Sequence, residues 1–259
     1  MSAPLAGKRV LVTRARGQAG ALVEELRAAG AEPVELPVIA FPPPRDSAPL
    51  AAALVRLPAY DWVIFSSANA VDAVLDTLAE RGEGSAVLGQ AKLAAIGPAT
   101  AARLAAHGLA PAFVPERFVA EEVLAGLLAR GVAGQQVLLP RAEEAREVLP
   151  EGLRAAGATV DVVAAYRTVR PEPSPDELDR LAPIDIVTLT SASTARNLAG
   201  LLGARRALLD GALVACIGPI TAQTATEAGF SVGLVARDYS IPGLVRALVE
   251  HYALERSRS

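Results

Sequence analysis

A short stretch that occurs twice decides the fold: AIGPATA at residues 95–101 returns as CIGPITA at residues 216–222. The glycines of the two copies are 121 residues apart (218 − 97). The helix predicted after each copy ends in a glycine, Gly108 or Gly229, at the same offset, because glycine readily takes the left-handed conformation at a helix end. Recurrence at a fixed offset predicts two copies of one supersecondary unit.

Other stretches repeat in the same order along the chain. The pairs are DWVIFSSAN at 61–69 with DIVTLTSAS at 185–193, VLVTR at 10–14 with VLLPR at 137–141, and LRAAGA at both 26–31 and 153–158. An internal duplication of about half the chain explains all of these pairs. A chain of 259 residues then favours two small domains over one large core.

Strand and helix patterns alternate within each copy. The predicted elements are strands at 8–14 and 33–39 around a helix at 18–29, a strand and a helix from 61, a strand at 92–96, a helix at 99–107, a short strand at 111–114 and a helix at 119–130. The first pattern restarts at 135, and residues 184–252 repeat the pattern of residues 61–131. Such alternation predicts an α/β protein with two doubly wound, flavodoxin-like parallel-sheet domains.

Two proline-rich stretches, at residues 37–44 and 169–175, are unsuited to a central strand and mark linkers. Linkers, rather than repeat boundaries, indicate where few contacts cross between domains. The predicted division is a discontinuous domain of residues 1–38 plus 174–259, a second domain of residues 44–166, and linkers at 39–43 and 167–173. Two crossings of the chain would then form a hinge, and a cleft between the two lobes is the expected place for a ligand.

Composition excludes several classes of function. The net charge of −3, with scattered basic residues, argues against a nucleic-acid partner. No apolar run approaches the roughly 20 residues that span a bilayer, and the N-terminus lacks the apolar region of a signal peptide, so we expect a cytoplasmic protein without a membrane partner. The single cysteine, Cys216, lies in an apolar strand and is expected to be buried and inert.

Small and polar residues follow the predicted strands, where ligands bind in doubly wound sheets. Each repeated Gly-Pro stretch places a glycine, Gly97 or Gly218, at a helix start and a threonine, Thr100 or Thr221, in the first helical turn. Free backbone N–H groups and the helix dipole favour anions there. The preceding loops of each copy add polar side chains at Ser66, Ser67, Asn69, Ser191 and Ser193. Simple N-capping is the alternative interpretation of these residues.

Cofactor motifs are missing from the sequence. Neither a phosphate-binding Gly-x-x-x-x-Gly-Lys-Ser loop nor a Gly-x-Gly-x-x-Gly after a strand is present. The two histidines, His107 and His251, lie at a helix end and near the C-terminus, and no Cys/His/carboxylate cluster has the spacing of metal ligands. We therefore expect neither a nucleotide cofactor nor a metal, and no Ser-His-acid triad.

Two arginines and one tyrosine complete the candidates. Arg14 and Arg141 end corresponding strands and would either bind ligand carboxylates or form surface ion pairs. Tyr166 breaks the symmetry, because its counterpart at an offset of 127 (166 − 39) is Ile39. It would either pack the domain crossing or donate a proton, since no histidine is available at that edge.

These motifs together resemble the uroporphyrinogen-III synthase family over nearly the whole chain. The stretches that carry the resemblance are FSSANAV at 65–71, IGPATA at 96–101, AYRT at 165–168, LTSAS at 189–193, IGPITA at 217–222 and YSIPGL at 239–244. The family pattern departs at Ile220, where a hydroxyl residue would form a Thr-Thr pair. The resemblance implies two α/β domains joined by a two-stranded crossover.

The resemblance also implies a reaction and roles for the residues. Hydroxymethylbilane would be cyclised to uroporphyrinogen III, with loss of water and inversion of ring D through a spiro intermediate, without a metal or organic cofactor. Tyr166 matches the family's candidate proton donor, and Thr100 and Thr221 match threonines that bind or orient the substrate. The carboxylates of the substrate would meet hydroxyl or backbone groups at Ser67, Ser191, Ser193 and Ser240. The implied partners are this linear substrate, its cyclic product and the upstream bilane-forming enzyme, and the implied oligomeric state is a monomer.

Two other classes of function share this architecture. A non-catalytic, two-lobed protein that binds small anions is disfavoured by the absence of an export signal and by the tyrosine at the crossover. A regulatory relative of the family would be expected to carry a fused DNA-binding domain.

Overall fold

The structure, a computed structural model, describes residues 3–179, 181 and 183–256. It divides into two compact units. The first unit contains the described residues up to Ala40 and from Val169 onward, and the second contains residues Phe41–Thr168. Each unit therefore combines residues from both halves of the sequence.

The first unit is built on a parallel five-stranded sheet in the order β2-β1-β7-β8-β9. Its strands are β1 (Arg9–Val12), β2 (Glu32–Glu35), β7 (Ile186–Leu189), β8 (Leu213–Cys216) and β9 (Val232–Val235). Its helices are α1 (Arg16–Ala28), α7 (Pro175–Asp179), α8 (Ala192–Leu202), α9 (Pro219–Glu227) and α10 (Ile241–Arg256), with a 3₁₀ segment η3 (Gly203–Leu209). Numbered within the unit, the strand order is 2-1-3-4-5, which is the flavodoxin-like order. Helices α1 and α10 pack on one face of the sheet, and α8 and α9 pack on the other.

The second unit has a parallel four-stranded sheet in the order β4-β3-β5-β6. Its strands are β3 (Trp62–Phe65), β4 (Lys92–Ala95), β5 (Gln136–Ala142) and β6 (Thr159–Tyr166). Its helices are α2 (Ala48–Val55), α3 (Ala68–Glu80), α4 (Pro98–Ala105), α5 (Ala120–Leu128) and α6 (Val148–Ala155), with 3₁₀ segments η1 (Leu57–Ala59) and η2 (Ser85–Gln90). Helices α5 and α6 cover one face, and α2, α3 and α4 cover the other. The predicted α/β fold with parallel sheets is confirmed.

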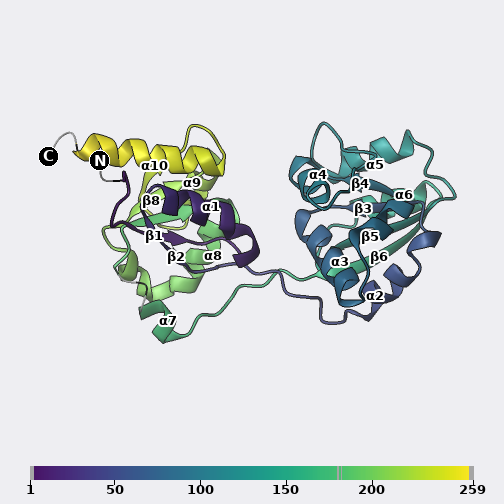
Figure 1. Ribbon diagram of the computed structural model, residues 1–259, viewed down its shortest axis with the longest axis horizontal. Coiled ribbons are helices and arrows are strands. Elements are labelled where there is room, and N and C mark those ends of the chain that lie inside the picture. The colour runs from purple at the N-terminus through teal and green to yellow at the C-terminus, as the bar shows by residue number, and fades with distance from the viewer. Residues whose placement is uncertain (1–2, 180, 182, 257–259) are drawn as a thin grey trace. The chain divides into compact units, whose positions relative to one another are not determined.

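The two copies of the repeat are exchanged between the sheets. In the first unit, β1 of the first copy pairs with β7 of the second copy; in the second unit, β3 of the first copy pairs with β5 of the second. The purple strands β1 and β2 in Figure 1 accordingly belong to the same sheet as the green strand β8. The second unit is thus a circular permutation of the first.

One predicted strand is wrong. Residues 111–114 form a single parallel bridge between Ala94 and Phe113 rather than a strand. Pro111 begins this segment and Pro115 follows it, and proline lacks the N–H that a sheet ladder needs. The corresponding segment of the first unit, β9, has no proline and pairs with β8 over several residues.

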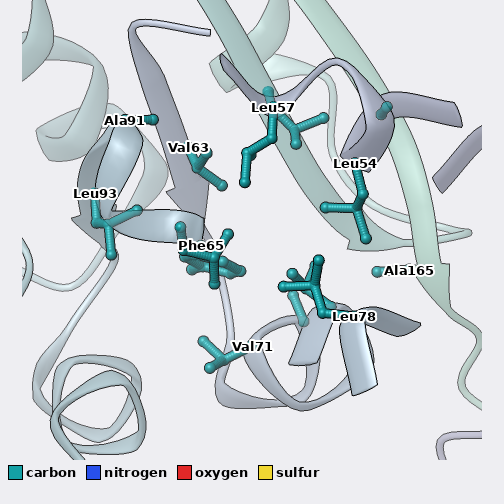
Figure 2. Close-up of a cluster of buried hydrophobic side chains, with 14 of the residues drawn as sticks. Leu54, Leu57, Val63, Phe65, Val71, Leu78, Ala91, Leu93 and Ala165 are labelled. Carbon is teal, nitrogen blue, oxygen red and sulfur yellow. The ribbon is translucent and has the colours of Figure 1, made fainter. Parts of the chain in front are cut away.

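A buried cluster holds the candidate tyrosine in place. Helix α2, which the sequence patterns did not indicate, closes this cluster together with α3 and the sheet. Figure 2 shows Phe65 of β3, Val71 and Leu78 of α3, and Ala165 of β6 converging within it. Tyr166 is the last residue of β6 and belongs to the same cluster. Its backbone position is therefore fixed by the core of the second unit.

The two connecting segments run antiparallel to each other. The backbone N–H of Ala40 donates to the carbonyl of Val169 at 2.9 Å, and the N–H of Val169 donates back to Ala40 at 3.0 Å. The N–H of Arg167 donates to the carbonyl of Pro42 at 3.0 Å.

Among the helices of the described residues, none combines the length and the apolar character that a membrane span requires.

Candidate active site

The predicted site residues lie where parallel strands end and helices begin. In the second unit, the loop after β3 is adjacent to the loop after β4, because the N–H of Ile96 donates to the carbonyl of Phe65 at 3.0 Å. The first unit repeats this arrangement, with the N–H of Ile217 donating to the carbonyl of Leu189 at 2.9 Å. Each unit therefore carries its serine loop and its Gly-Pro loop side by side at the carboxyl edge of its sheet, which is where this fold binds ligands.

The two Gly-Pro loops start helices that have no side-chain cap among the described residues. Gly97 is the N-cap of α4 and Gly218 is the N-cap of α9, each followed by proline at the first helical position. The two residues after each proline are Ala99 and Thr100 in α4, and Ile220 and Thr221 in α9. Their N–H groups precede the first intrahelical hydrogen bond, so they have no backbone acceptor among the described residues. Each helix start thus offers two backbone donors and the positive end of the helix dipole.

A buried threonine accompanies each of these helix starts. Thr100 is 3% exposed and Thr221 is 5% exposed. Within the described part of the chain, neither hydroxyl has a hydrogen-bond partner, although buried hydroxyls normally have one. No fully sealed side-chain oxygen of the described residues lacks a partner, so both hydroxyls retain access to solvent. Both hydroxyls are therefore available to bond water or a ligand.

An aromatic ring covers each glycine. Neither ring was predicted to be a site residue, although Tyr239 begins the YSIPGL stretch. A Cβ added to Gly97 would lie 3.0 Å from Cγ of Phe118, and one added to Gly218 would lie 3.2 Å from Cδ1 of Tyr239. The two rings are 121 residues apart (239 − 118), which is the offset of the repeat. That offset was the signal that could have identified them.

The serine loops provide helix N-caps, which was the alternative interpretation of these residues. Ser67 is the N-cap of α3, and its Oγ accepts a hydrogen bond from the backbone N–H of Ala70 at 3.2 Å. Ser66 and Asn69 flank this cap and are partly buried. The capping role does not occupy Ser67 completely, because the same Oγ lies 3.0 Å from the hydroxyl of Tyr166.

Tyr166 is held at this helix start by packing and by its hydroxyl contact. Its side chain is buried, and its ring meets the ring of Phe41 edge-on, with 5.7 Å between the centroids. Its carbonyl accepts a hydrogen bond from the N–H of Glu143 at 2.8 Å. The phenol therefore lies beside the serine at the start of α3, where it can donate or accept a proton.

The first unit places serines where the second unit has the tyrosine contact. Ser191 caps α8 in a capping box with Thr194, and its Oγ lies 2.9 Å from the Oγ of Ser193. Ser240 accepts a hydrogen bond from the N–H of Gly243 at 3.1 Å and donates to a carboxylate oxygen of Asp238 at 2.9 Å. All three serine hydroxyls have partners within the first unit.

The two arginines differ in what they contact. Arg141 forms an ion pair with Glu147 and donates to the carbonyl of Arg146 at 2.9 Å, as in the ion-pair alternative, although its side chain is only 11% exposed. Arg14 donates from Nε to the carbonyl of Gln18 at 2.9 Å and has no acidic partner among the described residues. Burial lowers the pKa of the Arg14 guanidinium below its ordinary value. Arg14 is thus a partly desolvated cation.

The remaining candidates are possible metal ligands and the single cysteine. No cluster of three or more His, Cys, Asp or Glu side chains in the described ranges could hold a metal ion. Cys216 ends β8 in the buried core, and burial raises the pKa of its thiol to about 11. The second unit thus carries backbone donors and the phenol of Tyr166, and the first unit carries backbone donors and the guanidinium of Arg14.

Known proteins have sequences similar to this chain. The family model described as uroporphyrinogen-III synthase HemD matches residues 20–246. A uroporphyrinogen-III synthase of Synechococcus elongatus is 36% identical over 254 residues, covering 95% of this chain and 96% of the relative.

Two crystal structures share the fold at lower identity. The uroporphyrinogen-III synthetase of Helicobacter pylori 26695 has a TM-score of 0.56 at 21% identity, covering 96% of this chain and 99% of that one. A mutant uroporphyrinogen III synthase of the extremely thermophilic bacterium Thermus thermophilus has the same TM-score at 17% identity, covering 96% and 100%. Since the family model spans most of the sequence and the Synechococcus relative aligns along nearly all of it, this chain belongs to the uroporphyrinogen-III synthase family.

Proposed function

We propose that this chain cyclises hydroxymethylbilane to uroporphyrinogen III, with Tyr166 as the proton donor and the two Gly-Pro helix starts as carboxylate-binding groups. Membership of the family makes the chain a hydro-lyase of tetrapyrrole biosynthesis. The observation that carries the assignment of the site is the duplicated, uncapped helix start with a buried threonine hydroxyl that has no partner in its own unit.

The first chemical step is loss of the terminal hydroxyl of the substrate. The pyrrole ring supplies the electron pair that breaks the C–O bond, and a proton must reach the departing oxygen so that it leaves as water. Tyr166 supplies this proton in our proposal, and Ser67, 3.0 Å from its hydroxyl, keeps the phenol oriented. The pyrrole carbon that forms the last bond of the macrocycle then loses its proton, and this proton restores the phenol.

The second requirement is control over which carbon closes the ring. Spontaneous closure joins the unsubstituted position and gives the type I isomer, so the enzyme must favour attack at the substituted carbon of ring D. Holding the acetate and propionate groups fixes the conformation of the chain. The helix starts at Gly97 and Gly218, together with Arg14, would hold these groups without a basic surface, consistent with a net charge of −3.

The setting of the reaction is also part of the proposal. We place the enzyme in the cytoplasm as a monomer that takes its unstable linear substrate from the upstream bilane-forming enzyme. It would act without a cofactor, because proton transfer and positioning account for every step.

The test is a product analysis. The purified protein is incubated with freshly prepared hydroxymethylbilane, the products are oxidised to porphyrins, and the type I and type III isomers are separated. We expect type III to dominate and the rate to exceed that of a control without protein. Type I alone, at the spontaneous rate, would contradict the proposed function.

A further inference from the structure

We infer that Phe118 and Tyr239 are substrate-contacting residues whose exposed ring faces stack against pyrrole rings of the tetrapyrrole. This inference rests on the proposed function and adds to it the groups that recognise the apolar part of the substrate. Each ring belongs to its own unit and lies over that unit's Gly-Pro helix start. The contact is therefore argued separately for the two units.

The glycines beneath the rings are not required by backbone conformation. Gly97 has a φ of −172° and Gly218 has a φ of −174°, which are extended values that any residue adopts. A side chain would instead be crowded by the ring, because its Cβ would lie 3.0 Å from Phe118 or 3.2 Å from Tyr239 and the ring would have to shift. The sequence thus keeps both glycines next to a ring, which indicates that the close approach of the ring matters.

The rings contribute little to the core of either unit. Phe118 is 56% exposed and Tyr239 is 65% exposed, and neither belongs to the buried clusters formed by the described residues. A single exposed aromatic residue would need no explanation. Two of them at the offset of the repeat, at the same position over the candidate site, do need one. Exposed aromatic side chains at a binding site are typical contributors to affinity.

The substrate has the two properties that this arrangement matches. Its carboxylates suit the backbone donors and threonine hydroxyls, and its pyrrole rings present aromatic faces that pack on other rings. In the second unit, Phe118 and Thr100 flank the same helix start, and Tyr239 and Thr221 do so in the first unit. A pyrrole ring on the aromatic face would bring its carboxylates to the donors beside it.

The two copies differ in the phenol group, and this difference separates ring contact from hydrogen bonding. Phe118 in one unit and Tyr239 in the other both present an aromatic face, but only Tyr239 has a hydroxyl. If the face is the functional group, Tyr239→Phe and Phe118→Tyr should both retain activity. Alanine at either position should weaken substrate binding.

The experiment measures KM, kcat and the isomer ratio with hydroxymethylbilane for these variants. Phe118→Ala and Tyr239→Ala should each raise KM about fivefold, change kcat less, and increase the fraction of type I product. The conservative exchanges should stay within about twofold of the wild type. Matched controls are Val55→Ala in the second unit and Leu254→Ala in the first, because both side chains are 61% exposed and lie outside the site residues. The controls should leave all three quantities unchanged.

The outcomes separate this inference from the proposed function. Wild-type protein that forms no type III product would contradict the proposed function, and the inference with it. Wild-type protein that forms type III, with alanine variants indistinguishable from it, would overturn the inference alone. If Phe118→Ala or Tyr239→Ala fails to fold, Phe118→Leu or Tyr239→Leu replaces it in the experiment, because leucine retains apolar bulk without an aromatic face. An unchanged KM in that folded leucine variant would also overturn the inference.

Discussion

The two units carry the same fold and the same helix starts, yet their serine loops make different contacts. In the second unit the cap serine, Ser67, contacts the hydroxyl of Tyr166. In the first unit its counterpart, Ser191, contacts Ser193, and the residue that corresponds to Tyr166 is Ile39. Both units thus keep the groups that suit a carboxylate, but only in the second does a phenol contact the cap serine among the described residues. The comparison indicates that the duplication provides groups that can bind carboxylates in both units. The contact that occurs in one unit alone, between Ser67 and Tyr166, provides the candidate proton donor.

The arginines also differ between the units, but here the first unit has the group that is more available to a ligand. Arg141 of the second unit is paired with Glu147, whereas Arg14 of the first unit has no acidic partner among the described residues. A cation already paired must exchange its partner before it binds a substrate carboxylate. The first unit is therefore expected to contribute more charge to binding, and the second more to proton transfer.

The largest expected effect comes from removing the phenol. Tyr166→Phe should lower kcat for type III formation about 10²-fold, the contribution typical of a general acid, while the ring keeps its packing against Phe41. Single-turnover formation of type III product measures it.

A second tyrosine provides the matched control. Tyr60→Phe also removes a buried hydroxyl that makes a hydrogen bond, in this case to Asp161 at 2.5 Å, but at the amino end of β3. It should leave kcat unchanged. If Tyr166→Phe retains activity within about twofold, or if both variants lose the same activity, Tyr166 has only a packing role.

The arginines should give the next largest effect. Arg14→Gln should raise KM about tenfold, because a hydrogen-bonded ion pair with a substrate carboxylate is lost. Arg141→Gln should raise KM no more than about twofold, since its charge already pairs with Glu147. Steady-state kinetics at fixed ionic strength compare the two. Equal effects of both variants would contradict the asymmetry.

Much of the fold could be predicted from the repeat alone. Parallel α/β sheets follow from the alternating patterns, and the duplication of 95–101 at 216–222 locates the helix starts. The segment at 111–114 was mispredicted, because its apolar pattern outweighed the prolines that prevent a ladder. Helix α2 was missed, because an alanine-rich run directly after prolines resembles a linker.

The site was predictable where local chemistry decides it, and less so where distant segments meet. The helix starts and serine caps follow from residues close in sequence. The contact between Ser67 and Tyr166 joins residues 99 positions apart, and it depends on the packing of α3 against β6. The pairing of Arg141 with Glu147 depends on how the intervening loop folds back, which no periodic pattern specifies.

The threonines test whether the units bind substrate equally. Thr100→Val and Thr221→Val should each raise KM about threefold, the loss of one neutral hydrogen bond, because neither hydroxyl bonds within its unit. Thr226→Val is the control, since its hydroxyl bonds the carbonyl of Ala222 at 3.0 Å on the exposed side of α9. An effect confined to one threonine would show that the repeated helix starts have different roles. No effect from either would remove both from the site.

The smallest expected effect concerns why glycine precedes each proline. Gly97→Ala should destabilise the fold by about 1 kcal/mol, because the new Cβ crowds the ring of Phe118. Relative to glycine, an alanine N-cap itself costs roughly 0.5 kcal/mol, but this cost is the same whether or not the ring is present. In a Phe118→Ala background the remaining cost should therefore fall to that smaller value, and urea unfolding of the four proteins measures the coupling. Gly218→Ala with Tyr239→Ala should show weaker coupling, since its closest contact is 3.2 Å rather than 3.0 Å. Full additivity in both units would mean that the glycines are retained for a reason other than the rings.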